Sequence, residues 1–244
     1  KAERRGDFYV LNGEKSSISL LPAADAVLVF ARIDNIPGYD GIRGYFVPCD
    51  TKGVSRTPYN SMGSKALGRG SLFLEDVHIP LDYCISKDKT AFKMAMIGFD
   101  YSRAIIGLMC LGAAEVSLEE TVKYARERTS FNKPLSTYQG ISFPISEYYT
   151  YLEAAKLLCY KTLWLRDNDV EHTKEAAMCK WWPPKLSAEI IHECLLMHGH
   201  YGYTDEYPYE QRLRDVIGLE IGDGTAQIQK LIIARKVIGE ECKS

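Results

Sequence analysis

The sequence lacks the signatures of several protein classes. Its seven cysteines are scattered without a Cys-x-x-Cys pair, which predicts reduced thiols and excludes a disulfide framework or a cysteine zinc site. Its five histidines form no His-Glu-x-x-His spacing, so no metal site is expected. A net charge of −2 leaves no basic footprint for nucleic acid. No apolar run approaches the roughly 18 residues of a membrane span, and no secretory signal is seen, so we expect no membrane partner.

What the sequence does contain begins with a β-rich region. Short apolar runs separated by Gly, Pro and Asp turns fill residues 1–82. Asn12-Gly13 directly follows the strand pattern of 8–11 and predicts a type I′ hairpin at that point. Further strands are predicted at 26–31, 44–48 and 71–74. The chain opens in the middle of this pattern, so we interpret it as part of a longer protein.

Helical periodicity follows from about Ala91. Long apolar-periodic segments of this length and spacing predict an antiparallel bundle over residues 90–244; they lie at 104–126, 142–166, 174–198 and 205–214, with a last helix after Asp223. Trp181-Trp182-Pro183-Pro184 is expected to kink or interrupt the third segment, because two prolines remove two backbone donors. The predicted fold class is α+β: a β-rich domain, in the form of a partial barrel or sandwich, followed by a helical bundle.

The segment at 223–229, Asp-Gly-Thr-Ala-Gln-Ile-Gln, places a carboxylate on a glycine turn ahead of the last helix. Two interpretations are open. Asp223 can cap the helix N-terminus, a contribution worth about 1 kcal/mol. It can also be a general base on a turn whose backbone N–H groups bind a carbonyl oxygen.

Four ordered blocks extend this motif and together resemble the acyl-CoA dehydrogenase family. The segment from Asp223 to Arg235 resembles the family's last helix, where most members have Glu-Gly-Thr. The other blocks are the run from Arg126 to Leu135 with Gln139 and Phe143; Gly199-His200-Tyr201-Gly202-Tyr203 with Pro208, Glu210, Arg214 and Asp215; and Leu11–Lys15 with Phe73–Pro80. The resemblance covers nearly all 244 residues. It also implies an N-terminal helical domain that is absent from this chain.

The resemblance implies a flavin-dependent α,β-dehydrogenation of an acyl-CoA thioester. Asp223 would remove the α-proton, the β-hydrogen would leave as hydride to N5 of FAD, and the Asp223 N–H would stabilise the thioester oxygen. Gly224 would let the turn approach the substrate closely. The implied partners are an acyl-CoA, electron-transfer flavoprotein and three further copies in a homotetramer. The implied compartment is the cytoplasm in bacteria, or the mitochondrial matrix in eukaryotes.

Asp in place of the family's Glu has two interpretations: the site is degraded, or the substrate's Cα lies differently from that of a straight-chain acyl group. The shorter side chain withdraws the carboxylate by roughly 1 Å, and a misplacement of that size can cost about 10²-fold in rate. A substrate branched at Cα would accommodate this. The segments around Lys180, His198 and Leu219 resemble most the alicyclic branch, which acts on cyclohexane- and cyclohexene-carbonyl-CoA in anaerobic aromatic degradation.

At other positions that match the family, a role in binding and a purely structural role are both open. Arg128 would reach the FAD pyrophosphate of a neighbouring subunit, or would simply interact with a helix end. Phe131 and Gln139 would line the adenosine part of that site, with a core position as the alternative for Phe131. Gly199 would approach the pyrophosphate, although the second family glycine is His200 here.

Thr225 and Gln227 would contact the dinucleotide, or are merely polar residues of a helix first turn. Arg103, with Asp100, matches the position that contacts CoA; the alternative is an ion pair within one helix.

Two positions of the sequence depart from the family pattern. The middle-domain Trp-x-Thr that packs on the flavin is Ser17-Ile18-Ser19, so Ser19 can offer a hydroxyl but Ser17 cannot stack. The position where some members carry an alternative base is Ser102, which leaves Asp223 without a rival. The alternatives to an alicyclic dehydrogenase are a non-catalytic binding or assembly subunit, or a dehydrogenase of linear or branched acyl-CoA.

Overall fold

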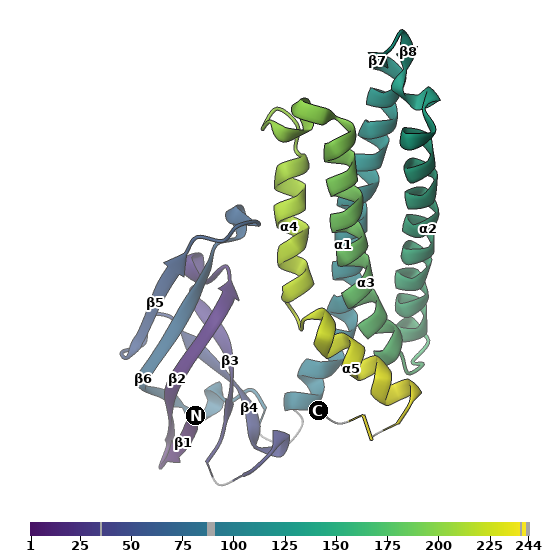
Figure 1. The fold of residues 1–244 in the computed structure, drawn as a ribbon. Helices are drawn as coiled ribbons and strands as arrows, with labels where there is room; N and C mark the ends of the chain where they lie inside the picture. Colours follow the sequence, from purple (N-terminus) through teal and green to yellow (C-terminus); the bar gives the residue numbers. More distant parts are fainter. Residues whose placement is uncertain (35, 87–90, 240, 243–244) are drawn as a thin grey trace. The chain divides into compact units, whose positions relative to one another are not determined.

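The computed structural model describes residues 1–34, 36–86, 91–239 and 241–242. The chain divides into two compact units, Lys1–Gly98 and Phe99–Ser244, each considered by itself. The first is β-rich and the second is a helical bundle, which confirms the predicted fold class (Figure 1).

The first unit is built from two antiparallel sheets. The larger has the strand order β1-β2-β6-β5, and β3 pairs with β4 in the smaller. Side chains from both sheets, including Leu11, Val29, Tyr45 and Val77, form a single buried core. The strands are β1 (Ala2–Arg5), β2 (Phe8–Ser19), β3 (Ala26–Arg32), β4 (Ile42–Pro48), β5 (Val54–Tyr59) and β6 (Arg69–Pro80).

The hairpin predicted at Asn12-Gly13 is wrong. Strand β2 continues through both residues, and its register against β6 shifts between Leu11 and Gly13. The Asn12 amide donates to Asp76 Oδ1 (3.0 Å) and accepts from the Asp76 N–H (2.8 Å). The Asn-Gly pair therefore forms a bulge, because cross-strand pairing with β6 extends the strand. The first hairpin turn lies at Gly6-Asp7, between β1 and β2, where Gly6 has a φ of +58°.

The second unit is a bundle of four long helices. Consecutive helices joined by short loops run antiparallel, and α5 lies across one end of the bundle, with the β7–β8 hairpin at the opposite end (Figure 1). The elements are α1 (Ala91–Glu127), β7 (Thr129–Ser130), β8 (Lys133–Pro134), α2 (Gln139–Asp167), α3 (Thr173–Met197), α4 (Tyr209–Ile221) and α5 (Ala226–Val237). Single-turn 3₁₀ segments connect the elements of both units: Leu21–Ala23 (η1), Tyr39–Gly41 (η2), Lys65–Leu67 (η3), Leu81–Tyr83 (η4), Leu135–Thr137 (η5) and Gly199–Tyr203 (η6).

Helix α3 is the central helix of the bundle, and the expected interruption at Pro183-Pro184 is wrong. Both prolines lie inside a continuous helix of which 12 of 25 residues are buried. Pro183 cannot donate to the Cys179 carbonyl. That carbonyl faces Gly107 of α1 so closely that a Cβ on Gly107 would lie 2.9 Å from its oxygen. Tight packing therefore offsets the roughly 3 kcal/mol that a proline costs inside a helix.

Two predicted helix boundaries differ from the structure, and so does the expectation that no segment could span a membrane. α1 begins at Ala91, where the helical signals begin in the sequence but before the predicted segment at 104–126, and α4 runs from Tyr209 to Ile221 instead of 205–214. α1 contains an 18-residue window with a mean hydropathy of 1.4, so by length and composition it could cross a membrane, contrary to the sequence expectation. The core helix of a bundle passes the same test, and Leu111 and Leu118 of α1 are buried in this one.

Candidate functional site

Asp223 lies on the turn that joins α4 to α5. Gly222 ends α4 with an extended conformation, Asp223 adopts the left-handed region (φ +54°), and Gly224 has a φ of +100°. Glycine reaches such angles without steric cost, and Asp tolerates the left-handed region better than most residues. The residue order Gly-Asp-Gly therefore turns the chain from α4 into α5 within three residues and leaves the Asp223 side chain exposed.

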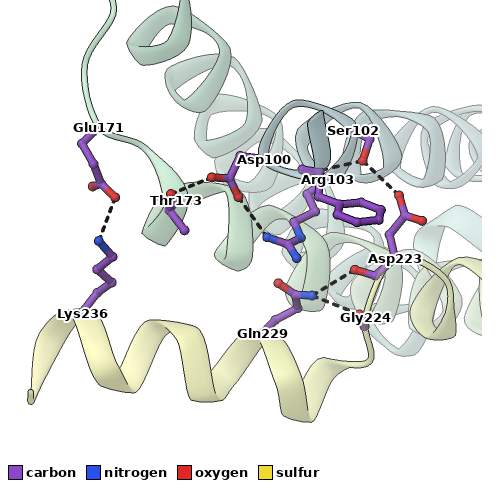
Figure 2. A network of polar contacts seen from close by, with 10 residues as sticks. Asp100, Ser102, Arg103, Glu171, Thr173, Asp223, Gly224, Gln229 and Lys236 are labelled. Atoms are coloured by element: carbon purple, nitrogen blue, oxygen red, sulfur yellow. Dashed lines mark hydrogen bonds and ion pairs between the residues drawn. The ribbon is translucent and has the colours of Figure 1, made fainter. Parts of the chain in front are cut away.

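The helix-capping interpretation of Asp223 is wrong. Helix α5 begins at Ala226 with Thr225 at its N-cap, and no side chain caps its first turn. The Asp223 Oδ2 atom instead accepts a hydrogen bond from Ser102 Oγ of α1 (2.9 Å) (Figure 2). Oδ1 makes no hydrogen bond within the part of the chain that the structure describes. One carboxylate oxygen is thus anchored, and the other is open to a proton.

Gln229 holds the same turn from α5. Its side chain is fully buried, and Nε2 donates to the Asp223 carbonyl (3.3 Å) and the Gly224 carbonyl (3.2 Å) (Figure 2). A Cβ on Gly224 would lie 2.6 Å from this Nε2. Glycine at 224 is therefore required by the turn itself, whether or not a substrate passes close by.

Asp100 and Arg103 form a buried ion pair on α1. Arg103 Nη1 donates to Asp100 Oδ1 (2.9 Å), and Thr173 Oγ1 donates to Oδ2 (2.6 Å) (Figure 2). The intrahelical alternative is thus observed. Arg103 Nε is buried with no hydrogen-bond partner in the described residues, as is Gln229 Oε1. Both side chains therefore keep unused polar capacity next to the Asp223 turn.

A buried cation lies behind the same turn. Lys180 of α3 is fully buried, and its Nζ donates to the backbone carbonyls of Leu219 (2.7 Å) and Glu220 (3.3 Å) in the last turn of α4. Burial lowers the pKa of Lys180, while the nearby Asp223 carboxylate opposes that shift.

A second group of predicted residues lies around the β7–β8 hairpin. Arg128 and Gln139 are exposed, and Phe131 is 89% exposed at the hairpin tip, so the core alternative for Phe131 is wrong. Phe131 and Asn132 both have positive φ (+48° and +64°), as a two-residue type I′ turn requires. A bulky aromatic residue in this conformation is uncommon. Its exposed ring and the Arg128 guanidinium are available to a group outside the bundle.

The Gly199 loop lies at the same end of the bundle as this hairpin (Figure 1). Gly199 has a φ of +61°, and a Cβ there would meet nothing within 4 Å. The preceding residue, His198, is buried: its Nδ1 contacts the Cys194 carbonyl (2.8 Å) and its Nε2 contacts the Tyr209 hydroxyl (3.1 Å). Burial lowers the pKa of His198. The loop backbone is therefore open to a ligand while its base is fixed.

The predicted residues of the second unit thus divide into two sets. Helix α4 separates the sets by its 13 residues, about 20 Å at 1.5 Å per residue. The set at the α5 end consists of Asp100, Arg103, Asp223, Gly224, Thr225 and Gln227, and the set at the hairpin end consists of Arg128, Phe131, Gln139 and Gly199.

Ser17 and Ser19 belong to the first unit. Both are exposed on β2, and Ser17 has a φ of +59° where the register against β6 shifts between Lys15 and Ile18. Neither hydroxyl makes a hydrogen bond within the described residues. Ser17 therefore lies in an irregular stretch of β2, at the position that the resemblance assigns to the stacking tryptophan.

The residues fit a dinucleotide such as FAD on three observations. The first turn of α5 has no capping side chain, so its N–H groups remain available to an anion. Gly199 leaves its backbone open, and Arg128 presents an exposed guanidinium that can form a bidentate fork with phosphate. Ser17 does not fit in the same way, because its side chain cannot stack on the flavin ring.

Three residues that contact the site were given no role from the sequence. From the sequence alone, Ser102 indicates only the absence of a second base, Gln229 belongs to a motif and Lys180 belongs to a resemblance. Ser102 bonds the Asp223 side chain and Lys180 bonds the end of α4 before the turn, and both contacts depend on helices far from Asp223 in the chain. Only the spacing of Gln229, six residues after Asp223, offered a local signal.

Comparison with known proteins identifies both regions. Residues 1–77 match the acyl-CoA dehydrogenase middle domain, and residues 92–238 match the acyl-CoA dehydrogenase C-terminal domain. Subunit CarC of the caffeyl-CoA reductase-Etf complex of Acetobacterium woodii is 35% identical over 94% of this chain and 61% of that protein. The mitochondrial short-chain specific acyl-CoA dehydrogenase of Mus musculus is 36% identical over 96% of this chain and 57% of the relative.

A solved structure supports the same assignment. Glutaryl-CoA dehydrogenase from Mycobacterium smegmatis in complex with FADH2 superposes with a TM-score of 0.91 at 27% identity, covering 98% of this chain and 61% of that one. The chain thus spans about six-tenths of the length of these relatives. FAD as the family's cofactor is confirmed by that complex, whereas none of the three relatives is named for an alicyclic substrate. With both of its domains matched, the chain belongs to the acyl-CoA dehydrogenase family.

Proposed function

We propose that the protein containing this chain is an FAD-dependent enzyme of acyl-CoA α,β-oxidation–reduction, with Asp223 as its base. The observation that carries the proposal is the state of Asp223. It is an exposed carboxylate on a left-handed turn, held through one oxygen by Ser102 and not used as a helix cap.

Different residues of the chain have different roles around the α-carbon, which loses its proton. Asp223 Oδ1 is open to accept the α-proton, while the Ser102 hydroxyl fixes Oδ2. The backbone N–H groups of the turn can bind the thioester oxygen, where negative charge develops as the proton leaves. General-base catalysis of this kind contributes about 10²–10⁴-fold in rate. Asp100 and Arg103 would border the CoA portion of the substrate.

When bound, FAD supplies the acceptor for the β-hydride. Thr225, Gln227 and the first turn of α5 would hold the dinucleotide at the Asp223 end, and Ser19 would offer it a hydroxyl. Arg128, Phe131, Gln139 and Gly199 would bind the dinucleotide of a neighbouring subunit, because they lie at the opposite end of α4 from Asp223. This division supports a homotetramer as the assembled form.

For the substrate we propose an alicyclic acyl-CoA such as cyclohexane-1-carbonyl-CoA. The support is the aspartate itself, since a base one methylene short favours a substrate whose Cα is carried toward it. In cyclohexane-1-carbonyl-CoA the α-carbon is itself a member of the ring, which carries it toward the carboxylate.

A second candidate runs the reaction in the opposite direction. The relative CarC is named as a subunit of a caffeyl-CoA reductase-Etf complex. By analogy, the protein would reduce an aryl-acrylyl-CoA, with Asp223 protonating Cα. In either direction electron-transfer flavoprotein is the proposed electron partner. The proposed compartment is the bacterial cytoplasm, or the mitochondrial matrix in a eukaryote.

The test of the base is Asp223→Asn in the full-length, flavin-loaded protein. The variant should retain FAD and bind acyl-CoA, while anaerobic bleaching of the flavin near 450 nm slows by about 10³-fold. Asp205→Asn, an exposed aspartate in the loop before α4, is the matched control and should bleach at the wild-type rate. Bleaching of Asp223→Asn at a near-normal rate would reject the base. Binding without bleaching in the wild type would favour a non-catalytic subunit.

The test of the substrate compares kcat/KM values. One methylene of misfit is worth roughly 10–200-fold, so cyclohexane-1-carbonyl-CoA should be oxidised at least about tenfold better than butyryl-CoA. Asp223→Glu should narrow that ratio. Equal activity on butyryl-CoA would leave a linear-chain dehydrogenase, and rapid reduction of an aryl-acrylyl-CoA without oxidation of either substrate would select the second candidate.

A further inference from the structure

Lys180 is the one fully buried lysine among the described residues. It makes no ion pair with a carboxylate there, and its ammonium is hydrogen-bonded to two backbone carbonyls, of Leu219 and Glu220. A buried ammonium is costly unless charge nearby compensates it. The carbonyl end of a helix carries the equivalent of about half a negative charge, so the last turn of α4 supplies part of that compensation.

The charged and titratable groups that face Lys180 come from three elements. Asp223 on the turn and Glu220 on α4 favour the ammonium, whereas Cys110 of α1 is a neutral thiol because burial raises its pKa to about 12. Arg103 of α1 opposes it. Asp223 is the strongest of these electrostatic neighbours, although its carboxylate makes its hydrogen bond to Ser102 and not to Lys180.

The position of Lys180 on α3 links it to the far end of α4. His198 follows Lys180 by 18 residues, which is five turns at 3.6 residues per turn, so both side chains lie on one face about 27 Å apart. That face meets α4 at both ends: His198 Nε2 contacts the hydroxyl of Tyr209, the first residue of α4, and Lys180 binds the last carbonyls. A buried polar side chain in α3 and another at its C-cap therefore hold α4 at its two ends.

We propose that Lys180 is a positioning residue for Asp223: it anchors the last turn of α4 and so sets where the carboxylate lies and what charge surrounds it. The inference rests on the proposed role of Asp223 as the base. The connection is short, because Asp223 follows Glu220 by three residues and Gly222 still donates to the Gly218 carbonyl of α4 (3.1 Å).

The experiment uses Lys180→Met in the full-length, flavin-loaded protein. Lys185→Met is the matched control, since Lys185 lies on the same helix but is exposed and forms a surface ion pair with Glu189. We expect hydrogen–deuterium exchange of residues 222–226 to accelerate in Lys180→Met, with the β7–β8 hairpin unchanged. Flavin reduction by acyl-CoA should slow by about 10–100-fold, as for a base displaced by roughly 1 Å. The acid limb of the pH–rate profile should also move to higher pH, because a neighbouring positive charge has gone.

The outcomes distinguish the role of Lys180 as a positioning residue from the role of Asp223 as the base. Unchanged exchange at 222–226 together with an unchanged pH–rate profile would overturn the role of Lys180, whatever the rate. A wild-type rate in Asp223→Asn would overturn the base instead, and with it the functional meaning of Lys180. If Lys180→Met does not fold, Lys180→Gln keeps a donor without the charge. In that variant the exchange should be largely restored and the pH–rate profile should still be shifted; an unshifted profile there would reject the electrostatic part of the role.

Discussion

The Asp223 turn and the Gly199 loop lie at opposite ends of α4 and differ in how their backbones are held. At Asp223, side chains from three helices, Ser102, Lys180 and Gln229, bind the turn or the helix end that precedes it. At Gly199 the fixed group is the residue before the glycine, His198, while the Gly199 backbone faces open space. A general base must reach one particular carbon atom, so the turn that carries it has to be fixed by its neighbours. A backbone that approaches a phosphate instead needs the space in front of it to be free of side chains.

Substituting the two glycines tests this difference most directly. Gly224→Ala would place a Cβ 2.6 Å from Gln229 Nε2 at a φ of +100°, so the turn must shift, and we expect flavin reduction to slow by about 10²-fold. Gly199→Ala meets no atom of the chain within 4 Å, so it should cost about 1–2 kcal/mol of stability for its left-handed conformation and weaken FAD binding, without slowing reduction once flavin is loaded. Stopped-flow reduction and urea unfolding measure both. Equal loss of rate in the two flavin-loaded variants would contradict the comparison.

Arg128 tests the hairpin end. Arg128→Ala removes an exposed guanidinium that we propose binds a neighbour's FAD pyrophosphate, and a hydrogen bond to a charged group is worth about 1.5–3 kcal/mol. FAD affinity should therefore fall about 10–100-fold while the bundle stays folded. Titration of FAD into apoprotein measures this, with the substitution of another exposed arginine two residues away, Arg126→Ala, as control. A monomer with full flavin occupancy, detected by light scattering, would exclude the subunit-sharing arrangement.

His198 gives the smallest expected effect, a pH dependence of stability. Burial lowers the pKa of His198, so the folded protein keeps this imidazole neutral at a pH where the unfolded chain, near 6.5, takes up a proton. The stability contributed is present above pH 6.5 and is lost as pH falls toward the folded-state pKa, by at most about 1.4 kcal/mol per pH unit. Urea unfolding between pH 8 and 5 should show a shallower decline in His198→Gln. The exposed His192→Gln should follow the wild type, and identical slopes in all three proteins would exclude His198 as the source.

Much of the fold was predictable because it depends on local pattern. Apolar periodicity located α2 and α3 to within a few residues and α1 at its C-terminal end, and the cysteines are all unpaired as predicted. The turn signal at Asn12-Gly13 and the helix-breaking signal at Pro183-Pro184 were the ones that failed. There the local signals for a turn or a break were outweighed by cross-strand pairing with Asp76 and by packing of α3 against α1.

The candidate site divides in the same way. The sequence by itself determined that a carboxylate, two flanking glycines and a following helix stand in the order typical of an acyl-CoA dehydrogenase base. It left open whether Asp223 caps the helix, whether Phe131 is core and whether Arg103 is free. Tertiary structure decided these: Asp223 binds Ser102, Phe131 is exposed at a hairpin tip, and Arg103 is buried against Asp100. The physical reason is distance along the chain, since Ser102 and Asp223 are 121 residues apart and meet only because α1 packs beside the end of α4.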